Sequence, residues 1–367
     1  MKTKDQIQKE ALESIGNLQM AGIEVSMGVG KTLTGLKHMA KFWNETANYL
    51  VVCPKLEIFE SWKKDAAEFG YSELIKCVTF TTYRSLNKQD TDLYDIIYLD
   101  ECHSLKESHE DWLGIQKLSG RKILGLTGTY PVRKSTEKGK MCNYFCPKVY
   151  EYTTDDAVDD DILNDYVIYV HKLALDGKPT IPVSARSGDT FYTSEAKSYN
   201  YWSNRLDAAS TPKEEQISRI QRMKALQKFP SKENYAQKLL SLQKDKTIVF
   251  ANTQKQADRL CKYSVHSKNK DSKENLKMFK EGSIDKLSAV EQLSEGVNIP
   301  NLKVGIIMHA YGNNRKATQK IGRLLRLNPD EKAIIHILCY YNSVDLEWVQ
   351  NALNNFDKSK INWIFPT

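Results

Sequence analysis

The stretch IEVSMGVGKTLTGLKHMAKFW (residues 23–43) contains the pattern that decides the fold. A short apolar run leads into a glycine-rich turn, and apolar residues at helical spacing follow. Glycine lets the backbone turn so that its N–H groups and the start of the helix face an anion. The order of strand, turn and helix predicts a loop that binds the phosphates of a nucleotide, formed by Met27, Gly28, Val29, Gly30, Lys31 and Thr32.

Two side chains of this loop have predicted chemical roles. The Lys31 ammonium would reach the β- and γ-phosphates, and the Thr32 hydroxyl would coordinate Mg²⁺. The pattern G-x-x-x-x-G-K-[ST] lacks its first glycine, because Val25 stands there. A coincidental glycine-rich turn is the alternative, and the strand before and the helix after the turn favour the phosphate loop.

The stretch YDIIYLDECHSL (residues 94–105) supplies the acidic partner that such a loop needs. A buried strand pattern ends in Asp100 and Glu101, and the carboxyl ends of parallel strands are where such sheets bind ligands. Asp100 is the predicted Mg²⁺ partner, directly or through water. Glu101 would orient and deprotonate the water that attacks the γ-phosphate.

Zinc binding is the competing interpretation of DECH, and the cysteine spacing disfavours it. Cys102 and His103 are adjacent, and no C-x-x-C or H-x-x-x-H partner lies near them. Cys142 and Cys146 stand four apart without a second pair, which is typical of structural thiols.

Composition indicates an ordinary globular protein, and the length allows two domains or one large one. The chain has 367 residues, of which 41% are hydrophobic and 27% charged. It has no apolar run of membrane-spanning length and no leader pattern at its start. Seven scattered cysteines favour a reducing compartment, so we expect a cytoplasmic protein without membrane contact. The net charge of +7 permits nucleic-acid binding without demonstrating it.

Strand and helix patterns alternate twice along the chain, which predicts an α/β fold with two parallel sheets. We expect a first domain over residues 1–154 and another over residues 246–367. Residues 155–245 would form a connector with a helical insertion. The acidic run at 155–161 is interpreted as a solvated linker or a helix start, since a metal site there would need further ligands.

MGVGKT together with DECH resembles the superfamily-two helicases and translocases. The resemblance implies two RecA-like domains that use ATP and Mg²⁺, with Asp100 and Glu101 in the roles described above. It implies a packing role for Cys102. It also implies that His103 links the nucleotide site to nucleic-acid contacts and to the second domain.

Further motifs of that family occur in the family's order. QIQKEAL (residues 6–12) resembles the glutamine motif that reads adenine, with Gln8 as reader; an exposed helix glutamine is the alternative. LTGTYP (126–131) resembles the motif that connects hydrolysis to nucleic-acid binding through Thr127 and Thr129. VVCPKLEIFESW (51–62) and VTFTTYRSL (78–86) resemble two strand-binding motifs. Their matching residues are Pro54, Lys55 and Trp62 in the first and Thr81, Thr82 and Tyr83 in the second.

For Trp62 taken alone, packing in the core is the ordinary role of such a residue. Hydroxyl side chains at strand ends suit phosphate contacts that ignore base identity.

The second half resembles the family's other domain. KTIVFANTQKQADRL (246–260) places Asn252 and Thr253 at a strand end, as nucleic-acid contacts. SAVEQLSEGVNIPN (288–301) resembles motif five, with Ser294 toward nucleic acid and Gly296 and Asn298 toward the nucleotide.

QKIGRLLR (319–326) matches the pattern Q-x-x-G-R-x-x-R, whose fixed positions share one helix face: Gln319, Gly322, Arg323 and Arg326. A solvated basic helix is the alternative. The resemblance implies that Arg326 is an arginine finger and that Arg323 lies close to the γ-phosphate.

The resemblance implies an ATP-dependent helicase or translocase that hydrolyses ATP when the cleft between the two domains closes. DNA is favoured over RNA as the partner, by the spelling of DECH and of QKIGRLLR. An RNA helicase, or a non-unwinding ATP-dependent motor or scaffold subunit of a larger assembly, are the alternatives. We expect a monomer. In the connector, Tyr199, Tyr201 and Trp202 would pack against the motor or stack on bases.

Overall fold

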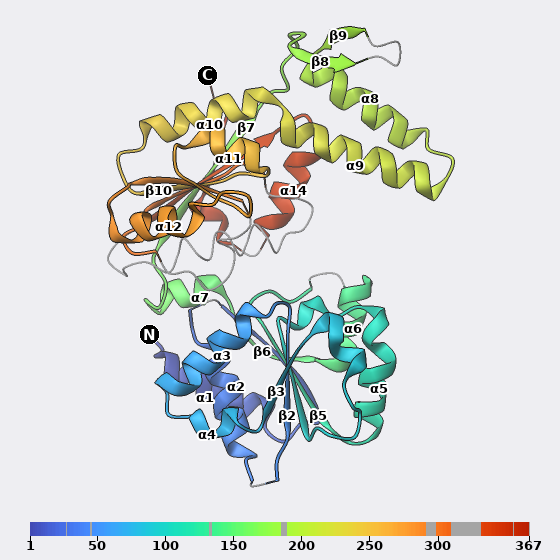
Figure 1. Cartoon of the computed structure of the whole chain (residues 1–367), viewed down its shortest axis with the longest axis vertical. Coiled ribbons are helices and arrows are strands. Elements are labelled where there is room, and N and C mark those ends of the chain that lie inside the picture. The colour runs from blue at the N-terminus through green and yellow to red at the C-terminus, as the bar shows by residue number, and fades with distance from the viewer. Residues whose placement is uncertain are drawn as a thin grey trace. The chain divides into compact units, whose positions relative to one another are not determined.

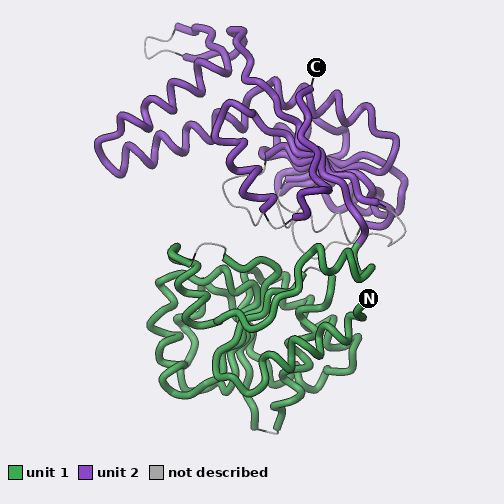
Figure 2. Tube along the Cα trace, turned by 180° about the vertical axis from the view of Figure 1, so that it is seen from behind, with its two compact units in different colours: residues 1–163 green, residues 164–367 purple. Residues whose placement is uncertain are grey.

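The computed structural model describes residues 1–26, 28–44, 46–131, 134–184, 189–290, 299–309, 332–354 and 356–366. The chain divides into two compact units, Met1–Leu163 and Asn164–Thr367 (Figure 2). Each unit has one large parallel sheet with helices around it, so the predicted α/β class and the two parallel sheets are confirmed (Figure 1). In the ranges just given, no helix is long and apolar enough to cross a bilayer.

The first unit is built on a six-stranded sheet of order β3-β2-β4-β5-β1-β6, in which every neighbouring pair is parallel. Its strands are β1 Met20–Val25, β2 Tyr49–Cys53, β3 Val78–Thr82, β4 Ile96–Asp100, β5 Lys122–Thr127 and β6 Lys148–Tyr152. All five residues of β2 and of β4 are buried, as expected of central strands that helices cover on both faces.

Helices α1, α2, α3 and α4 lie on one face of this sheet, and α5 and α6 lie on the other (Figure 1). Their bounds are α1 Lys4–Ile15, α2 Lys31–Lys41, α3 Glu57–Glu68, α4 Ser72–Ile75, α5 Glu110–Leu118, α6 Glu137–Phe145 and α7 Thr154–Asp159. Three short 3-10 helices span Tyr83–Lys88, Cys102–Ser104 and Glu107–His109. The acidic run forms α7, whose N-cap Thr153 accepts a hydrogen bond from the Asp156 N–H.

Strand order brings the predicted catalytic stretches to one edge of the sheet. β5 pairs with both β1 and β4, so the carboxyl ends of these three strands are neighbours. In the register, Glu24 of β1 is opposite Thr127, and Asp100 of β4 is opposite Leu126. The glycine-rich turn, DECH and LTGTYP therefore leave the sheet side by side.

The second unit has a seven-stranded parallel sheet of order β11-β12-β10-β13-β14-β7-β15. Its strands are β7 Tyr166–Leu173, β10 Thr247–Phe250, β11 Ser264–Val265, β12 Lys286–Ala289, β13 Val304–Ile307, β14 Ala333–Tyr340 and β15 Ile361–Ile364. From the sequence, residues 155–245 are expected to form a connector. Strand β7 comes from that range, and it lies within the sheet, between β14 and β15. Residues 155–163 belong to the first unit.

The helical insertion expected in the connector lies in the second unit. Helices α8 and α9 run side by side, and a small antiparallel hairpin lies at one end of them (Figure 1). The remaining helices cover the sheet. The bounds are β8 Ile181–Ser184, β9 Thr190–Thr193, α8 Glu195–Asp207, α9 Pro212–Lys228, α10 Pro230–Leu242, α11 Gln254–Leu260, α12 Ser272–Glu281 and α14 Val344–Ala352, with a 3-10 turn at Lys358–Lys360.

Two of the three connector aromatics have clear environments. Tyr199 is buried, and its hydroxyl accepts a hydrogen bond from the Val344 N–H at 2.9 Å. Tyr201 is exposed, and its ring meets that of Trp202 edge-on. Tyr199 therefore packs, as one of the two expectations has it, and Tyr201 is open to solvent.

A buried histidine pair joins β7 to β14. His171 Nε2 lies 2.9 Å from His336 Nδ1, and the Tyr235 hydroxyl lies 2.9 Å from His171 Nδ1. Burial lowers the pKa of both imidazoles, that of His336 to about 4, with the neighbouring His171 adding to the effect. Both rings are therefore neutral in the folded unit at pH 7.

This pair predicts loss of stability in acid. Below about pH 6.5 the unfolded chain gains a proton at His336 that the folded chain refuses until about pH 4, so stability falls with pH across that window. Between pH 7 and pH 5, the free energy of unfolding should fall by about 2 kcal/mol through this residue. Urea unfolding followed by circular dichroism measures it. His336→Asn keeps a polar atom and cannot titrate, so it should lose correspondingly less; an identical pH dependence in both proteins contradicts the assignment.

Candidate ATP site

The phosphate loop has the backbone geometry that the sequence predicts for it. Gly28 and Gly30 have φ of 96° and 97°, in the region that favours glycine, and α2 begins directly after Gly30. A Cβ on Gly30 would lie 2.8 Å from Gln8 Nε2, so a larger residue there would displace the end of the Gln8 side chain. The turn thus brings the N-terminus of α2, with Lys31 and Thr32, to the sheet edge.

Gln8 of α1 holds this loop in place. Its side chain is buried, and its Nε2 donates to the Val29 carbonyl at 2.7 Å. Lys37 donates to Gln8 Oε1, also at 2.7 Å. Both ends of the amide are thus bonded to protein groups. The alternative of an exposed helix glutamine is excluded, and the reading of adenine stays a prediction.

Lys31 and Glu101 form an ion pair across the sheet edge. Lys31 Nζ lies 3.1 Å from Glu101 Oε1, and the side chains are 14% and 20% exposed. Glu101 has φ 53° and ψ 54°, a left-handed conformation that is uncommon for a residue with a side chain. That conformation turns the chain at the end of β4 directly into the following 3-10 turn. It places the Lys31 ammonium and the Glu101 carboxylate in contact with each other.

Asp100 is a buried carboxylate at the last position of β4. Trp62 Nε1 donates to its Oδ2 at 2.9 Å, and the Tyr83 hydroxyl donates to its carbonyl, also at 2.9 Å. Burial and then the charge of Glu101 raise the pKa of Asp100 to about 6, against the opposing effects of Lys31 and Trp62. Two carboxylates enclosed side by side favour a bound cation.

The predicted coupling residues meet behind Glu101. His103 Nδ1 lies 2.6 Å from Thr127 Oγ1, and both groups are 3.3 Å from Glu101 Oε2. The Thr129 N–H donates to the Thr127 hydroxyl at 3.1 Å. These groups connect β4 to β5 through hydrogen bonds. The Thr129 hydroxyl itself is buried without a partner among the described residues.

The oxygen donors at this edge fit Mg²⁺. A hard divalent cation prefers carboxylate and hydroxyl oxygen, and Mg²⁺ takes one or two protein carboxylates plus phosphate oxygens. Asp100 and Thr32 are such donors, and the Thr32 hydroxyl opposes the rise that burial causes in the pKa of Asp65 of α3. Over the described part of the chain, no group of three or more His, Cys, Asp or Glu side chains is arranged to hold a metal. The cysteines near DECH are buried free thiols, which agrees with their predicted structural role.

The predicted nucleic-acid contacts of the first unit differ in their exposure. Lys55 is exposed, and Pro54 and Thr82 are half-buried. Thr81 is 5% exposed and Tyr83 is 7% exposed, since the first accepts from Gln89 Nε2 and the second bonds to β4. The side chains of Lys55, Pro54 and Thr82 can therefore contact a partner. Those of Thr81 and Tyr83 form hydrogen bonds within the unit.

In the second unit, Asn252 and Thr253 follow the end of β10 and are half-buried. The Thr253 hydroxyl caps α11, because it accepts from the Gln256 N–H at 3.2 Å. The other predicted residues lie outside the described ones: Met27, Ser294, Gly296, Asn298, Gln319, Gly322, Arg323 and Arg326.

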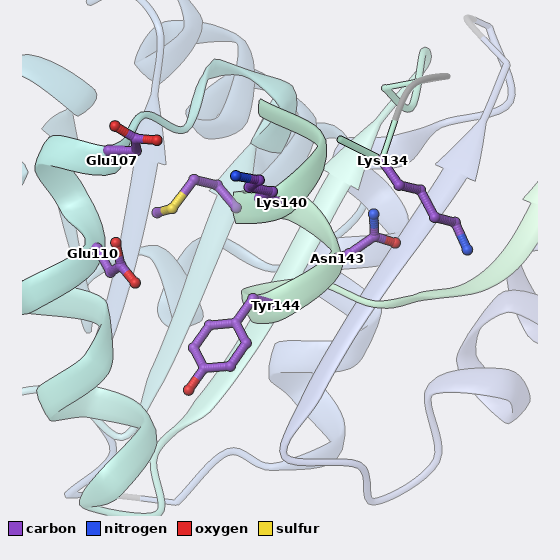
Figure 3. Close-up of a pocket in the computed structure, with 7 residues that line it drawn as sticks. Glu107, Glu110, Lys134, Lys140, Asn143 and Tyr144 are labelled. Carbon is purple, nitrogen blue, oxygen red and sulfur yellow. The ribbon is translucent and has the colours of Figure 1, made fainter. Parts of the chain in front are cut away.

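A pocket of about 730 Å³ in the first unit contains none of the predicted residues. Figure 3 shows its lining side chains, among them Lys140, Asn143 and Tyr144 of α6 and Glu110 of α5. It is a broad opening with both acidic and basic side chains on its wall. The side chains at the carboxyl ends of β1, β4 and β5 are more specific evidence for a nucleotide site than the volume of this pocket.

Sequence analysis missed the hydrogen bond of Trp62 with Asp100 and the effect of Thr32 on the pKa of Asp65, both of which involve α3. The resemblance matches Trp62 to a strand-binding motif, whereas its residue type predicts a place in the core. It is fully buried, so the second placement agrees with the structure. No local pattern signals its bond to a residue 38 positions away.

Comparisons with known proteins identify the family to which the chain is similar. Residues 2–132 match the family model "Type III restriction enzyme, res subunit", and residues 231–328 match "Helicase conserved C-terminal domain". A relative named DNA 3'-5' translocase XPB2, from Sulfurisphaera tokodaii, is 23% identical over 378 aligned positions, covering 90% of this chain and 80% of that protein.

Solved structures share the fold. The DNA-bound ATP-dependent Type ISP restriction-modification enzyme LlaBIII has a TM-score of 0.62 at 14% identity. The match covers 100% of this chain and only 31% of that much longer one. S. cerevisiae Dbp5, bound to RNA and ADP BeF3, has a TM-score of 0.56 at 11% identity, covering 98% of this chain and 89% of that one.

The two family models occur in the same order as the motifs, and each falls on one of the two sheet-based units. The chain therefore belongs to the superfamily-two helicases and translocases, which are ATP-hydrolysing enzymes with two RecA-like domains.

Proposed function

We propose that this chain is an ATP-driven motor that moves along or unwinds DNA, with ATP hydrolysed at the edge formed by β1, β4 and β5. The observation that carries the proposal is the Lys31–Glu101 pair at 3.1 Å, which joins the phosphate loop to DECH. Gly28, Gly30, Thr32 and Asp100, which would also act on ATP, follow or end strands of the same edge, and Gln8 of α1 contacts the loop there.

The described residues suggest how hydrolysis would proceed. A γ-phosphate in the loop would draw the Lys31 ammonium away from Glu101, since a phosphate carries more negative charge than a carboxylate. Glu101 would then be released to orient a water and accept its proton. Mg²⁺, held by Asp100 and Thr32, would neutralise charge on the phosphates. Arg323 and Arg326 of the second unit are the proposed cations for the transferring phosphoryl group.

DNA is the proposed track for two reasons. The relative that aligns with 90% of this chain is named as a DNA translocase, and the solved structure with a TM-score of 0.62 was determined with DNA. The RNA-bound structure shares the fold at lower identity, so RNA is retained as an outcome of the test. The proposed contacts of the first unit are Pro54, Lys55 and Thr82.

Coupling between DNA and hydrolysis is proposed to run through His103 and Thr127. The Thr127 hydroxyl lies between the imidazole and the carboxylate, so a shift of the loop after β5 would alter the position of Glu101. The His103 and Thr127 side chains are almost completely buried, which makes their hydrogen bonds costly to lose.

Thr127→Val tests this coupling. Valine keeps the shape and removes the hydroxyl, so stimulation of ATP hydrolysis by DNA should fall about tenfold, the worth of a hydrogen bond to a charged group. Steady-state ATPase rates with and without DNA give the stimulation factor. Thr129→Val is the comparison, because its hydroxyl has no partner in the described residues and should matter less. Equal effects of the two substitutions would argue against the hydrogen-bonded route.

The track itself is tested by a panel of ATPase rates with single-stranded, duplex and forked DNA and with matched RNA. DNA should raise the rate at least severalfold, and RNA should raise it less. Lys31→Ala should abolish the stimulated rate, whereas Lys41→Ala, an exposed lysine of the same helix, should not. Stronger stimulation by RNA identifies an RNA helicase instead. Stimulation by DNA without strand separation on forks identifies a motor that does not unwind.

A further inference from the structure

The Trp62 indole lies between helix α2, which carries Lys31 and Thr32, and the end of strand β4, which carries Asp100. It is 0% exposed, and its Nε1 donates to Asp100 Oδ2 at 2.9 Å. Cys53 Sγ lies 4.0 Å from the same oxygen, and a thiol is the weaker donor. A side chain buried this far inside the first unit cannot stack on a nucleic acid, so the role suggested by resemblance does not account for its hydrogen bond.

The same indole touches the helix that carries Lys31 and Thr32. A Cβ on Gly35 of α2 would lie 2.6 Å from Trp62 Cη2, a distance that no side chain tolerates. The indole ring also lies near Tyr98 of β4, with ring centroids 6.4 Å apart. Trp62 of α3 is therefore in direct contact with both α2 and β4, which supply the two proposed Mg²⁺ donors.

An aspartate in a strand needs such a contact to be a well-defined metal ligand. Rotation about the terminal torsion of a carboxylate is soft, so the strand alone does not fix where each oxygen points. A hydrogen bond from a rigid buried ring fixes that torsion. Residues that orient a metal ligand in this way typically contribute 10- to 100-fold to metal affinity.

We propose that Trp62 is a positioning residue for Mg²⁺: by holding Asp100 Oδ2, it presents the other carboxylate oxygen to the cation bound with the nucleotide. The inference rests on the proposed function, since it takes Asp100 as the Mg²⁺ partner. It assigns to helix α3 a role in nucleotide binding that is separate from contact with DNA.

The chain offers a matched control in Trp112. That residue lies in the same unit, is 5% exposed, and donates through Nε1 to the Gln89 carbonyl at 2.9 Å. Trp112→Phe therefore removes a hydrogen bond of the same kind, from a buried indole N–H, at a distance from Asp100. A general loosening of the unit would affect Trp62→Phe and Trp112→Phe alike, whereas metal positioning would affect only the first.

The experiment measures binding of ADP by calorimetry, once with Mg²⁺ and once with EDTA, in the full chain. The ratio of the two affinities reports the metal. In Trp62→Phe the ratio should fall about tenfold or more, while affinity without metal stays within about twofold. Trp112→Phe should keep the wild-type ratio. Benzothienylalanine at position 62, which replaces the N–H by sulfur at constant shape, should reproduce the loss and covers the case in which phenylalanine disturbs folding.

Two outcomes overturn the inference. One is an unchanged ratio in both variants at position 62, and the other is an equal loss in Trp112→Phe. A wild-type chain whose ADP affinity does not respond to Mg²⁺ would instead refute the metal site of the proposed function.

Discussion

The first unit depends on compensating two neighbouring carboxylates at the end of a buried strand. β4 has helices over both faces of its sheet, and its last residue and the next are Asp100 and Glu101. Enclosing charge is costly unless each oxygen has a partner, so the surrounding elements must supply them. The partners come from α2 as an ammonium, from α3 as an indole N–H, and from β5 as a hydroxyl. Elements far apart in sequence are drawn to one sheet edge by this requirement.

That requirement also means that the side chains of the site have partners within the first unit itself. The Lys31–Glu101 ion pair can break when a phosphate binds Lys31. The His103–Thr127 hydrogen bond can break when the loop after β5 moves. The Trp62–Asp100 bond is different in kind, because a rigid, fully buried ring supplies it. The site thus combines one fixed carboxylate with one that can be released, which suits a metal ligand and a base respectively.

Local patterns predicted much of this. The turn at Gly28 and Gly30 follows from glycine alone, and the position of Asp100 follows from an apolar run ending in an acid. Both are short-range features. The burial of Thr81 and Tyr83 was not predictable, because it depends on which groups β4 and the 3-10 turn after β3 bring against them. The bond from Trp62 joins residues 38 positions apart, and no periodicity encodes it. Strand β7 was placed in a connector, since its partners β14 and β15 lie at the far end of the chain.

We propose that Glu101 is the base for ATP hydrolysis and that Lys31 restrains it until the nucleotide binds. The most direct measurement compares Glu101→Gln with wild type in a single-turnover assay that records bound and hydrolysed ATP together. Glutamine keeps the shape and removes the charge. The account predicts ATP affinity within about threefold of wild type and hydrolysis slowed by about 10²-fold or more, the usual worth of a general base. Hydrolysis at the wild-type rate would contradict it.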